Sequence, residues 1–334
     1  MSTKPFVVNH DGKKHNIEHF LRFHPGGTNT LSMLKNADVT DRLIATHHSA
    51  AAYELLKDYR VDDGDPKKYV REDGDLESLV DWNRPMFWQV GSLGPKYKEW
   101  VLAPVDRKLR LFGSDFIESL TITSWYMVPS IWIPVMLYLI FIGYQRLRSI
   151  VDQTLLDSFS IGAWVVCSTV LGLLLWPLIE YTIHRWLFHL QPPDNSPLLI
   201  TLHFGIHGLH HKVPFDDRRL LFPPGPAAVL ISAAYAIYLM LFPHWMAPLV
   251  LAGMIAGYVT YDLIHFYLHY GCPSEGSYMY TMKRYHNQHH FAHHESGFGI
   301  SSQFWDHIFG TAIALKKLSR CLKWIISQQS CRSV

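Results

Sequence analysis

The sequence predicts a multidomain protein in which a small α+β domain precedes an all-α integral membrane domain with four transmembrane helices. Three observations support this fold class. The first 120 residues are mixed and polar, whereas most of the apolar runs come later. Four of these runs approach the length of about 20 residues that a helix needs to cross a bilayer. Histidines gather in four groups, each beside an apolar run, which predicts a histidine-rich cap on the membrane domain.

The composition fits a membrane protein and excludes several other classes. The 334 residues allow two domains, and 49% of them are hydrophobic. A net charge of +2 gives no indication of a nucleic-acid partner. The four cysteines fit neither a zinc site nor a disulfide framework, which favours a reducing cytosolic face. Residues 1–15 lack the apolar core of a signal peptide, so we expect the chain to start in the cytosol.

Residues 1–61 carry the signals of a small ligand-binding domain. A short apolar strand at residues 6–8 leads into an Asp-Gly turn and a further short segment. The His-Pro-Gly-Gly motif that begins at His24 makes a tight turn, and its glycines let a flat ligand approach the backbone. His48 follows 24 residues later and leads into a helical stripe over residues 52–59.

This segment resembles cytochrome b5 in its His-Pro-Gly-Gly motif and in the position of the second histidine. The resemblance implies that His24 and His48 are the axial ligands of a b-type haem. His47 is a neighbouring alternative that the sequence leaves open. Two imidazoles fill both axial positions of the iron, so such a haem transfers electrons and offers no open site for oxygen.

Residues 62–124 are predicted to form a linker and then a segment at the membrane surface. Residues 62–81 are charged and punctuated by Gly and Pro, as in a flexible linker. Aromatic and basic side chains alternate after this point. Trp and Tyr favour the membrane–water boundary, and Lys and Arg favour its cytosolic side. An interfacial segment is therefore favoured over a buried core. Its aromatic residues are Trp82, Phe87, Trp88, Tyr97 and Trp100.

The membrane domain is predicted to occupy residues 125–310. Its apolar runs cover residues 125–144, 161–179, 227–242 and 245–264. The third run is short and needs part of residues 222–226 to span. An even number of spans and a cytosolic start place all four histidine groups on the cytosolic side. Arg146 and Arg148 then lie on the lumenal side, against the usual bias of basic residues towards the cytosol.

Ten histidines are candidate ligands for two metal ions. Imidazole suits iron, zinc, copper and nickel, and ten ligands are too many for one ion and a natural number for two. Ionisable groups at membrane depth are costly, which favours a functional role. The candidates are His184, His189, His207, His210, His211, His265, His269, His286, His289 and His290. The remaining histidines nearby are expected to support the ligands or to take no part, with His203 and His293 the first exceptions to consider: His203, His293, His294 and His307.

The spacing of the candidates is helical, with one exception. His265 and His269 are four residues apart and share a helix face. His184 and His189 are five apart, about 140° around an ideal helix, so they share a face only where the helix breaks or ends. Otherwise each serves a different ion. Glu180 and Asp262 each lie about one turn before a candidate ligand, and we hypothesise that they accept its second ring N–H. A solvated carboxylate or a helix-end charge is the alternative at both positions.

Several stretches resemble the fatty acid 2-hydroxylase family, within the membrane fatty acid hydroxylase and sterol desaturase superfamily. They include IEYTIHRWLFH, YDLIHFYLHYG and YHNQHHFAHHESGFGIS, and the order of the two domains also matches. The resemblance implies a di-iron monooxygenase of the endoplasmic reticulum membrane with its site facing the cytosol. It implies hydroxylation by O2 at C2 of long and very long fatty acids that enter ceramides and other sphingolipids. Electrons would come from NAD(P)H through cytochrome b5 reductase or cytochrome P450 reductase.

Two alternatives stay open at this stage. The same metal chemistry serves a desaturase, or a hydroxylase that acts on another carbon or on a sterol. A zinc-storing or metal-transporting membrane protein is the alternative from another class, although the electron-transfer haem favours redox-active iron. Zinc is also able to replace iron in a purified sample, because the same imidazoles bind it.

Two further expectations concern the substrate and the end of the chain. The carboxylate of a fatty acid needs a cation near the metal site, and four side chains are candidates. They are Arg185, Lys212, Arg218 and Arg219. Residues 311–334 depart from the family pattern and interleave basic with apolar residues, which predicts a basic amphipathic helix on the membrane or a disordered tail.

Overall fold

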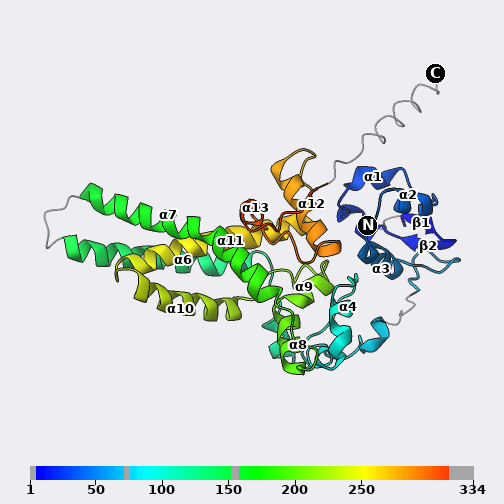
Figure 1. Cartoon of the computed structure of the whole chain (residues 1–334), viewed down its shortest axis with the longest axis horizontal. Helices are drawn as coiled ribbons and strands as arrows, with labels where there is room; N and C mark the ends of the chain where they lie inside the picture. The colour runs from blue at the N-terminus through cyan, green and yellow to red at the C-terminus, as the bar shows by residue number, and fades with distance from the viewer. Residues whose placement is uncertain (1–4, 71–75, 152–157, 316–334) are drawn as a thin grey trace, which may run out of the picture.

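The computed structural model describes residues 5–70, 76–151 and 158–315. An N-terminal α+β domain lies at one end, four long helices extend at the other, and short helices form a cap between them (Figure 1). The predicted order of a small α+β domain and an all-α domain is confirmed. The tail helix expected at the end of the chain lies outside the described residues from residue 316 onwards, as does part of the predicted linker at residues 71–75.

The N-terminal domain begins with a two-stranded antiparallel hairpin. Strand β1 (Val7–His10) pairs with β2 (Lys13–Asn16). Asp11 and Gly12 join them with positive φ angles of 47° and 73°, the backbone twist that a two-residue hairpin loop requires. The predicted strand and Asp-Gly turn are therefore confirmed. The domain continues with η1 (His19–Arg22), α1 (Thr28–Ser32), α2 (Thr40–Ala45) and α3 (Ala50–Asp58).

Four helices are long and apolar enough to cross a membrane. They are α6 (Met127–Val151), α7 (Ser158–Ile183), α10 (Pro224–Leu241) and α11 (Met246–Tyr270). Each overlaps one predicted run, and α10 reaches 18 residues only because it begins at Pro224, before the apolar run itself. The chain is therefore a multi-pass membrane protein.

Arg146 links neighbouring helices at the end that is far from the cap. Its Nη1 donates to the carbonyl of His244 at 3.0 Å and to the Tyr235 hydroxyl at 3.3 Å. The guanidinium thus ties α6 to α10 and to the short connection between α10 and α11. This pairing gives Arg146 a structural role at this end of the helices.

The cap is built around aromatic side chains from the segment before the first span. Its first helices are η2 (Glu77–Leu79), η3 (Val90–Lys96), α4 (Tyr97–Val101) and α5 (Asp115–Ser119). Trp100 is fully buried and its ring lies 5.7 Å from that of Phe204. The segment predicted to lie at the membrane surface therefore buries Tyr97 and Trp100 inside the cap and leaves Trp88 exposed. Its contact with a bilayer stays a prediction.

The remaining short elements lie where the cap meets the long helices. They are η4 (His184–Phe188), α8 (Pro197–His203), η5 (Phe204–Gly208), α9 (Leu209–Lys212), α12 (Tyr278–Phe291) and α13 (Phe304–Ile308).

Helix α11 is the centre of the membrane domain, because it packs against α6, α7 and α10 and is buried along most of its length. Two glycines allow its close crossing with α7. A Cβ atom at Gly253 would lie 1.8 Å from the Thr169 carbonyl oxygen, and one at Gly172 would lie 1.9 Å from that of Val250. Small residues at such crossings let helix backbones approach within a membrane.

Replacing Gly253 with Ala is expected to lower the thermal unfolding midpoint in detergent, because α7 and α11 would have to separate. Overpacking of this kind costs about 1–3 kcal/mol. Gly162→Ala on α7 is the control, since nothing lies within 4 Å of its added Cβ atom. Equal midpoints for Gly253→Ala and the unchanged chain would contradict the close crossing.

Candidate metal centre

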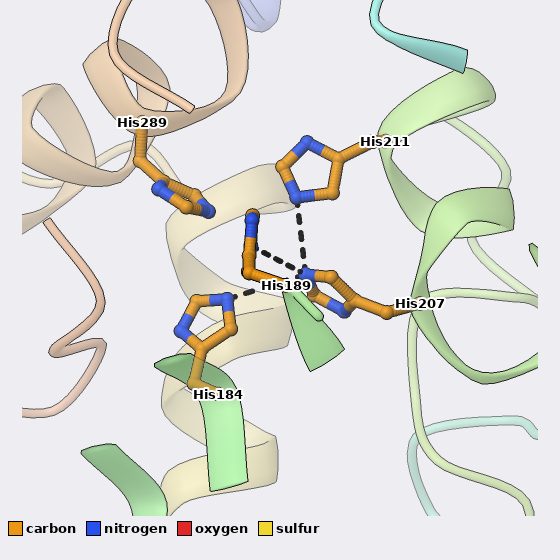
Figure 2. Close-up of side chains that lie close together, drawn as sticks. All are labelled: His184, His189, His207, His211 and His289. Atoms are coloured by element: carbon orange, nitrogen blue, oxygen red, sulfur yellow. Dashed lines mark hydrogen bonds between the residues drawn. The ribbon is translucent and has the colours of Figure 1, made fainter. Parts of the chain in front are cut away.

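The ten candidate histidines form two clusters of five. The first consists of His184, His189, His207, His211 and His289, whose rings point towards a common centre (Figure 2). The second consists of His210, His265, His269, His286 and His290. Within each cluster the ligand nitrogens all lie within 4.8 Å of one another. The sequence predicted the ten residues, and the structure divides them five and five.

Two π-helical turns explain how the upstream histidines meet. η4 is a π-helix, and the N–H of His189 donates to the carbonyl of His184 at 3.1 Å. This i→i+5 bond brings two residues five apart onto the same side of the helix. The conflict in the sequence spacing is resolved in this way, and both histidines serve the first cluster. η5 is a second π-helix, and it ends where α9 begins.

The nitrogen spacing within each cluster fits ligands around one ion. In the first cluster, the Nε2 of His207 lies 3.0–3.2 Å from three other Nε2 atoms. In the second, the Nε2 of His286 lies 2.9–3.1 Å from three others. Bonds of about 2.1 Å at about 90° give ligands about 3.0 Å apart, whereas tetrahedral angles give about 3.4 Å. This spacing therefore differs from that of a four-coordinate structural zinc site.

The second ring nitrogens orient two of the imidazoles. His184 Nδ1 donates to the carbonyl of Phe298 at 2.6 Å, and His289 Nδ1 donates to that of Ser296 at 2.7 Å. Each bond holds the proton on Nδ1 and leaves the Nε2 lone pair for a metal. Burial also lowers the pKa of His289 well below its usual range. Its Nε2 is buried without a hydrogen-bond partner among the described residues, as expected of a ligand.

Two carboxylates hold the loop that supplies these carbonyls. Asp306 accepts from the N–H groups of Phe298 and Gly299 at 2.9 and 2.8 Å. Glu180 accepts from the N–H groups of Ile300 and Ser301 at 2.8 and 2.9 Å. The hypothesis that Glu180 directly binds the ring of His184 is therefore wrong, because a backbone carbonyl takes that position. Asp306 is a supporting residue that sequence spacing could not reveal.

Asp262 differs from its predicted role as well. Its Oδ2 is buried and has no hydrogen-bond partner among the described residues, although the side chain lines a cavity beside His265. The four remaining histidines lie outside both clusters. Of these, His203 is bound through Nδ1 to the Tyr97 hydroxyl at 2.6 Å, which gives it a structural role in the cap.

A separate histidine pair lies in the N-terminal domain. The rings of His24 and His48 are 6.3 Å apart at an angle of 27°. His24 Nδ1 lies 3.2 Å from Thr30 Oγ1, and His48 Nδ1 lies 2.8 Å from Thr46 Oγ1, so both Nε2 atoms are left for an iron. Burial, helped by the nearby His48, lowers the pKa of His24 to about 4. Two imidazoles bonded at about 2.0 Å to one iron place their ring centres about 6 Å apart, so this pair fits a haem.

The four candidate cations have different surroundings. Lys212 is fully buried, and its Nζ donates to Glu77, Trp100 and Ala103 at 2.6–2.9 Å. All three of its donors are used, so the expectation that it binds a substrate carboxylate is wrong. Arg185 and Arg218 are not among the residues that line the cavity next to the clusters, whereas Arg219 is.

These features define a class of protein: a multi-pass membrane protein with an imidazole-rich site in its cap and a bis-histidine site in a small N-terminal domain. Family comparisons identify both parts. The profile of the fatty acid hydroxylase family matches residues 169–311. The profile of the cytochrome b5-like heme/steroid binding domain matches residues 2–63.

Individual relatives cover most of the chain. A fatty acid 2-hydroxylase of Rattus norvegicus is 42% identical over 88% of this chain and 87% of its own length. A dihydroceramide fatty acyl 2-hydroxylase of Arabidopsis thaliana is 39% identical over 72% of this chain and 96% of its own. The solved structure of full-length scs7p, in which only the hydroxylase domain is visible, aligns with a TM-score of 0.62 and 32% identity. The alignment covers 72% of this chain and 89% of that one.

The chain therefore belongs to the fatty acid 2-hydroxylase family. It is an oxidoreductase, and its N-terminal domain is a cytochrome b5-type haem domain. The histidine clusters are compatible with metal binding, and they lie within the residues matched by the hydroxylase profile.

Replacing His289 with Ala is expected to remove metal from the first cluster and to leave the second cluster loaded. The metal content per chain, measured by inductively coupled plasma mass spectrometry, should fall by about half. His293→Ala is the control, because His293 is exposed and belongs to neither cluster. An unchanged metal content in His289→Ala would contradict the expectation that the first cluster needs this histidine to retain its metal.

Proposed function

We propose that this protein inserts one oxygen atom of O2 at C2 of long and very long acyl chains that enter ceramides and other sphingolipids. One observation carries the proposal. An apolar cavity of about 520 Å³ reaches from the long helices to histidines of both clusters. His207 of the first cluster and His210 and His265 of the second line the same cavity. A carbon atom at this end would therefore face both metal positions.

The cavity suits an acyl chain. Its far part is lined by apolar side chains of α10, including Leu230, Ala234 and Ile237, and by Met254 and Ile255 of α11. Helices α10 and α11 are two of the four candidate spans, so the chain of a membrane lipid would lie at the depth of its own hydrocarbon. Such a chain would enter the cavity without crossing water, because lipid tails are as apolar as the lining side chains, and the lining would exclude water from the reacting carbon.

The polar groups at the near end favour an acyl amide over a free fatty acid. Arg219 lines the cavity, but its guanidinium is paired with Glu118 and donates to Thr121 Oγ1 at 3.1 Å. Asp262 lines it too, and its Oδ2 lacks a partner among the described residues. A second carboxylate would be repelled by ionised Asp262, whereas an amide N–H or a hydroxyl could donate to this oxygen. The Tyr258 hydroxyl lines the same cavity beside Asp262 and would share this role. The relative in Arabidopsis thaliana is named a dihydroceramide fatty acyl hydroxylase.

Two iron ions are the proposed metals, one in each five-imidazole cluster. When bound, iron would supply the reduction of O2 that hydroxylation needs, and zinc would occupy the same ligands without redox chemistry. The nitrogen spacing of about 3.0 Å supports an ion with more than four ligands. The protein's own contribution is to keep the imidazoles neutral, to orient His184 and His289 through carbonyls, and to hold the acyl chain in an apolar cavity.

The proposed electron source is NAD(P)H, through cytochrome b5 reductase or cytochrome P450 reductase. His24 and His48 would both bind the haem iron, and such a haem would supply electron transfer and would not react with the substrate. We further propose an endoplasmic reticulum location with the haem domain and the metal centre on the cytosolic side. The N-terminal domain and the histidine-bearing helices α9 and α12 lie at the same end of the four long helices (Figure 1), which supports one common side of the membrane for both sites.

The proposed division of the chain follows these functions. Residues 1–61 would bind haem, residues 62–124 would link it to the membrane and complete the cap, and residues 125–310 would carry out hydroxylation. Residues 311–334 would form a basic tail. The nearest alternative function is desaturation, or hydroxylation at another carbon or of a sterol, and the products distinguish these reactions.

Cells that lack their own 2-hydroxylase are expected to make 2-hydroxy fatty acids when they express the intact chain, and to make none with His24→Ala or His289→Ala. Mass spectrometry of hydrolysed sphingolipids measures this. His47→Asn is the control, because His47 is exposed, and Asn tolerates its positive φ of 52°. A new double bond, or oxygen on a different carbon, would replace the proposed reaction with its nearest alternative.

Replacing Ala234 with Phe is expected to shift the products towards shorter acyl chains, because the ring would fill the far part of the cavity. A several-fold fall in the ratio of very long to long 2-hydroxy chains is expected. Ala236→Phe is the matched control: it lies two residues away on α10, is exposed, and is not part of the cavity lining. The same chain-length profile in both variants would place the acyl chain elsewhere.

A further inference from the structure

The haem domain, defined here by the matched residues 2–63, contacts the cap through a buried ion pair. Asp58 at the end of α3 binds Arg107, with Oδ1 lying 2.9 Å from Nη2 and 3.1 Å from Nε. Both side chains are only 5% exposed. Asp58 Oδ2 also accepts the backbone N–H of Asp106 at 2.9 Å. Paired buried charges with several directed bonds allow one relative position, because any shift would leave a charge unpaired away from water.

Asp106 adds a second polar contact beside the first. Its Oδ2 accepts from the Tyr59 hydroxyl and from His19 Nδ1, each at 2.8 Å. Asp106 therefore accepts hydrogen bonds from the haem domain through its carboxylate, and Arg107 donates hydrogen bonds to it through its guanidinium. Neither residue contributes to the metal clusters or to the cavity, so the hydroxylation site alone does not account for them.

An aromatic row lies next to this ion pair and joins the two histidine sites. The Phe20 ring is 5.9 Å from His24 of the haem pair and 5.8 Å from Phe215 of the cap. The Phe215 ring is 6.2 Å from Phe291, which is 6.2 Å from the ring of His290 in the second cluster. Phe23 packs beside the row, 5.0 Å from Phe215. The row thus runs without a gap from a haem ligand to a candidate metal ligand.

We propose that the haem domain delivers electrons from one docked position, which Asp58 and Arg107 hold. In this position the row of Phe20, Phe215 and Phe291 is the contact through which an electron passes from the haem at His24 to the metal at His290. Each transfer oxidises the haem iron from the ferrous to the ferric state and reduces a metal ion by one electron. The reductase restores the ferrous haem after each transfer. The inference rests on the proposed function, and it adds the place and the positioning residues of the electron transfer.

The docked position has a structural signature that does not depend on metal or activity. Asp58→Asn is expected to raise amide hydrogen exchange in η1 and α3, because the buried Arg107 loses its charged partner. Glu54→Gln on the same helix is the control, since Glu54 is partly exposed and pairs only with its neighbour Lys57 among the contacts described. Both variants should keep the haem absorbance of the intact chain. Equal exchange in Asp58→Asn and Glu54→Gln would overturn the docked position.

The electron path is tested by stopped-flow absorbance on the full chain loaded with haem and iron. The haem is reduced without oxygen and then mixed with O2 and an N-acyl sphingoid substrate in detergent. Phe215→Leu and Asp58→Asn are expected to slow haem reoxidation by at least about tenfold, with haem spectrum and iron content unchanged. Phe304→Leu is the control, because Phe304 is exposed on α13 and lies outside the row.

Chemical reduction of the metal centre separates the two proposals. With the iron reduced directly, the intact chain and Phe215→Leu should form equal amounts of 2-hydroxy product in one turnover. If the intact chain forms no such product, the proposed function falls and the inference with it. If it forms product while the reoxidation rate is the same in the intact chain and both variants, the proposed function stands and the docked electron path is overturned.

Discussion

The convergence of buried, neutral imidazoles is the constraint on which the rest of the structure depends. Successive residues of a helix point about 100° apart. α9 therefore sends His211 to the first cluster and His210 to the second, and α12 does the same with His289 and His290. Both helices therefore contribute ligands to both clusters, which fixes the position of one cluster relative to the other.

The surrounding elements hold these helices in position. α11 supplies two ligands from the most buried of the long helices, and its close crossing with α7 fixes their height relative to His184. Glu180 and Asp306 restrain the loop whose carbonyls orient the first cluster. Ligands that are oriented in this way before a metal binds lose little freedom on binding. Burying unprotonated imidazoles without hydrogen-bond partners is costly, and metal binding would offset this cost.

The cap is where the acyl chain and the haem domain would meet. An acyl chain would reach the clusters through an apolar cavity among the long helices, on the side of His207 and His265. The haem domain packs on the cap near Phe291 and His290. The segment with Trp100 and Arg107 is shared by both functions, because it forms the core of the cap and also binds Asp58. This sharing explains why aromatic residues that suit a membrane surface are buried here.

The sequence by itself determined the features that depend on local periodicity and residue chemistry. The strand and turn of the haem domain, the four spans and the ten candidate imidazoles were each predicted from residue spacing within single short segments of the chain. The tertiary structure decided everything that depends on distances between elements. It divided the ligands five and five, placed a π-turn between His184 and His189, and withdrew Lys212 into the cap. It also set Asp58 against Arg107, because partners 49 residues apart meet only when whole elements pack together.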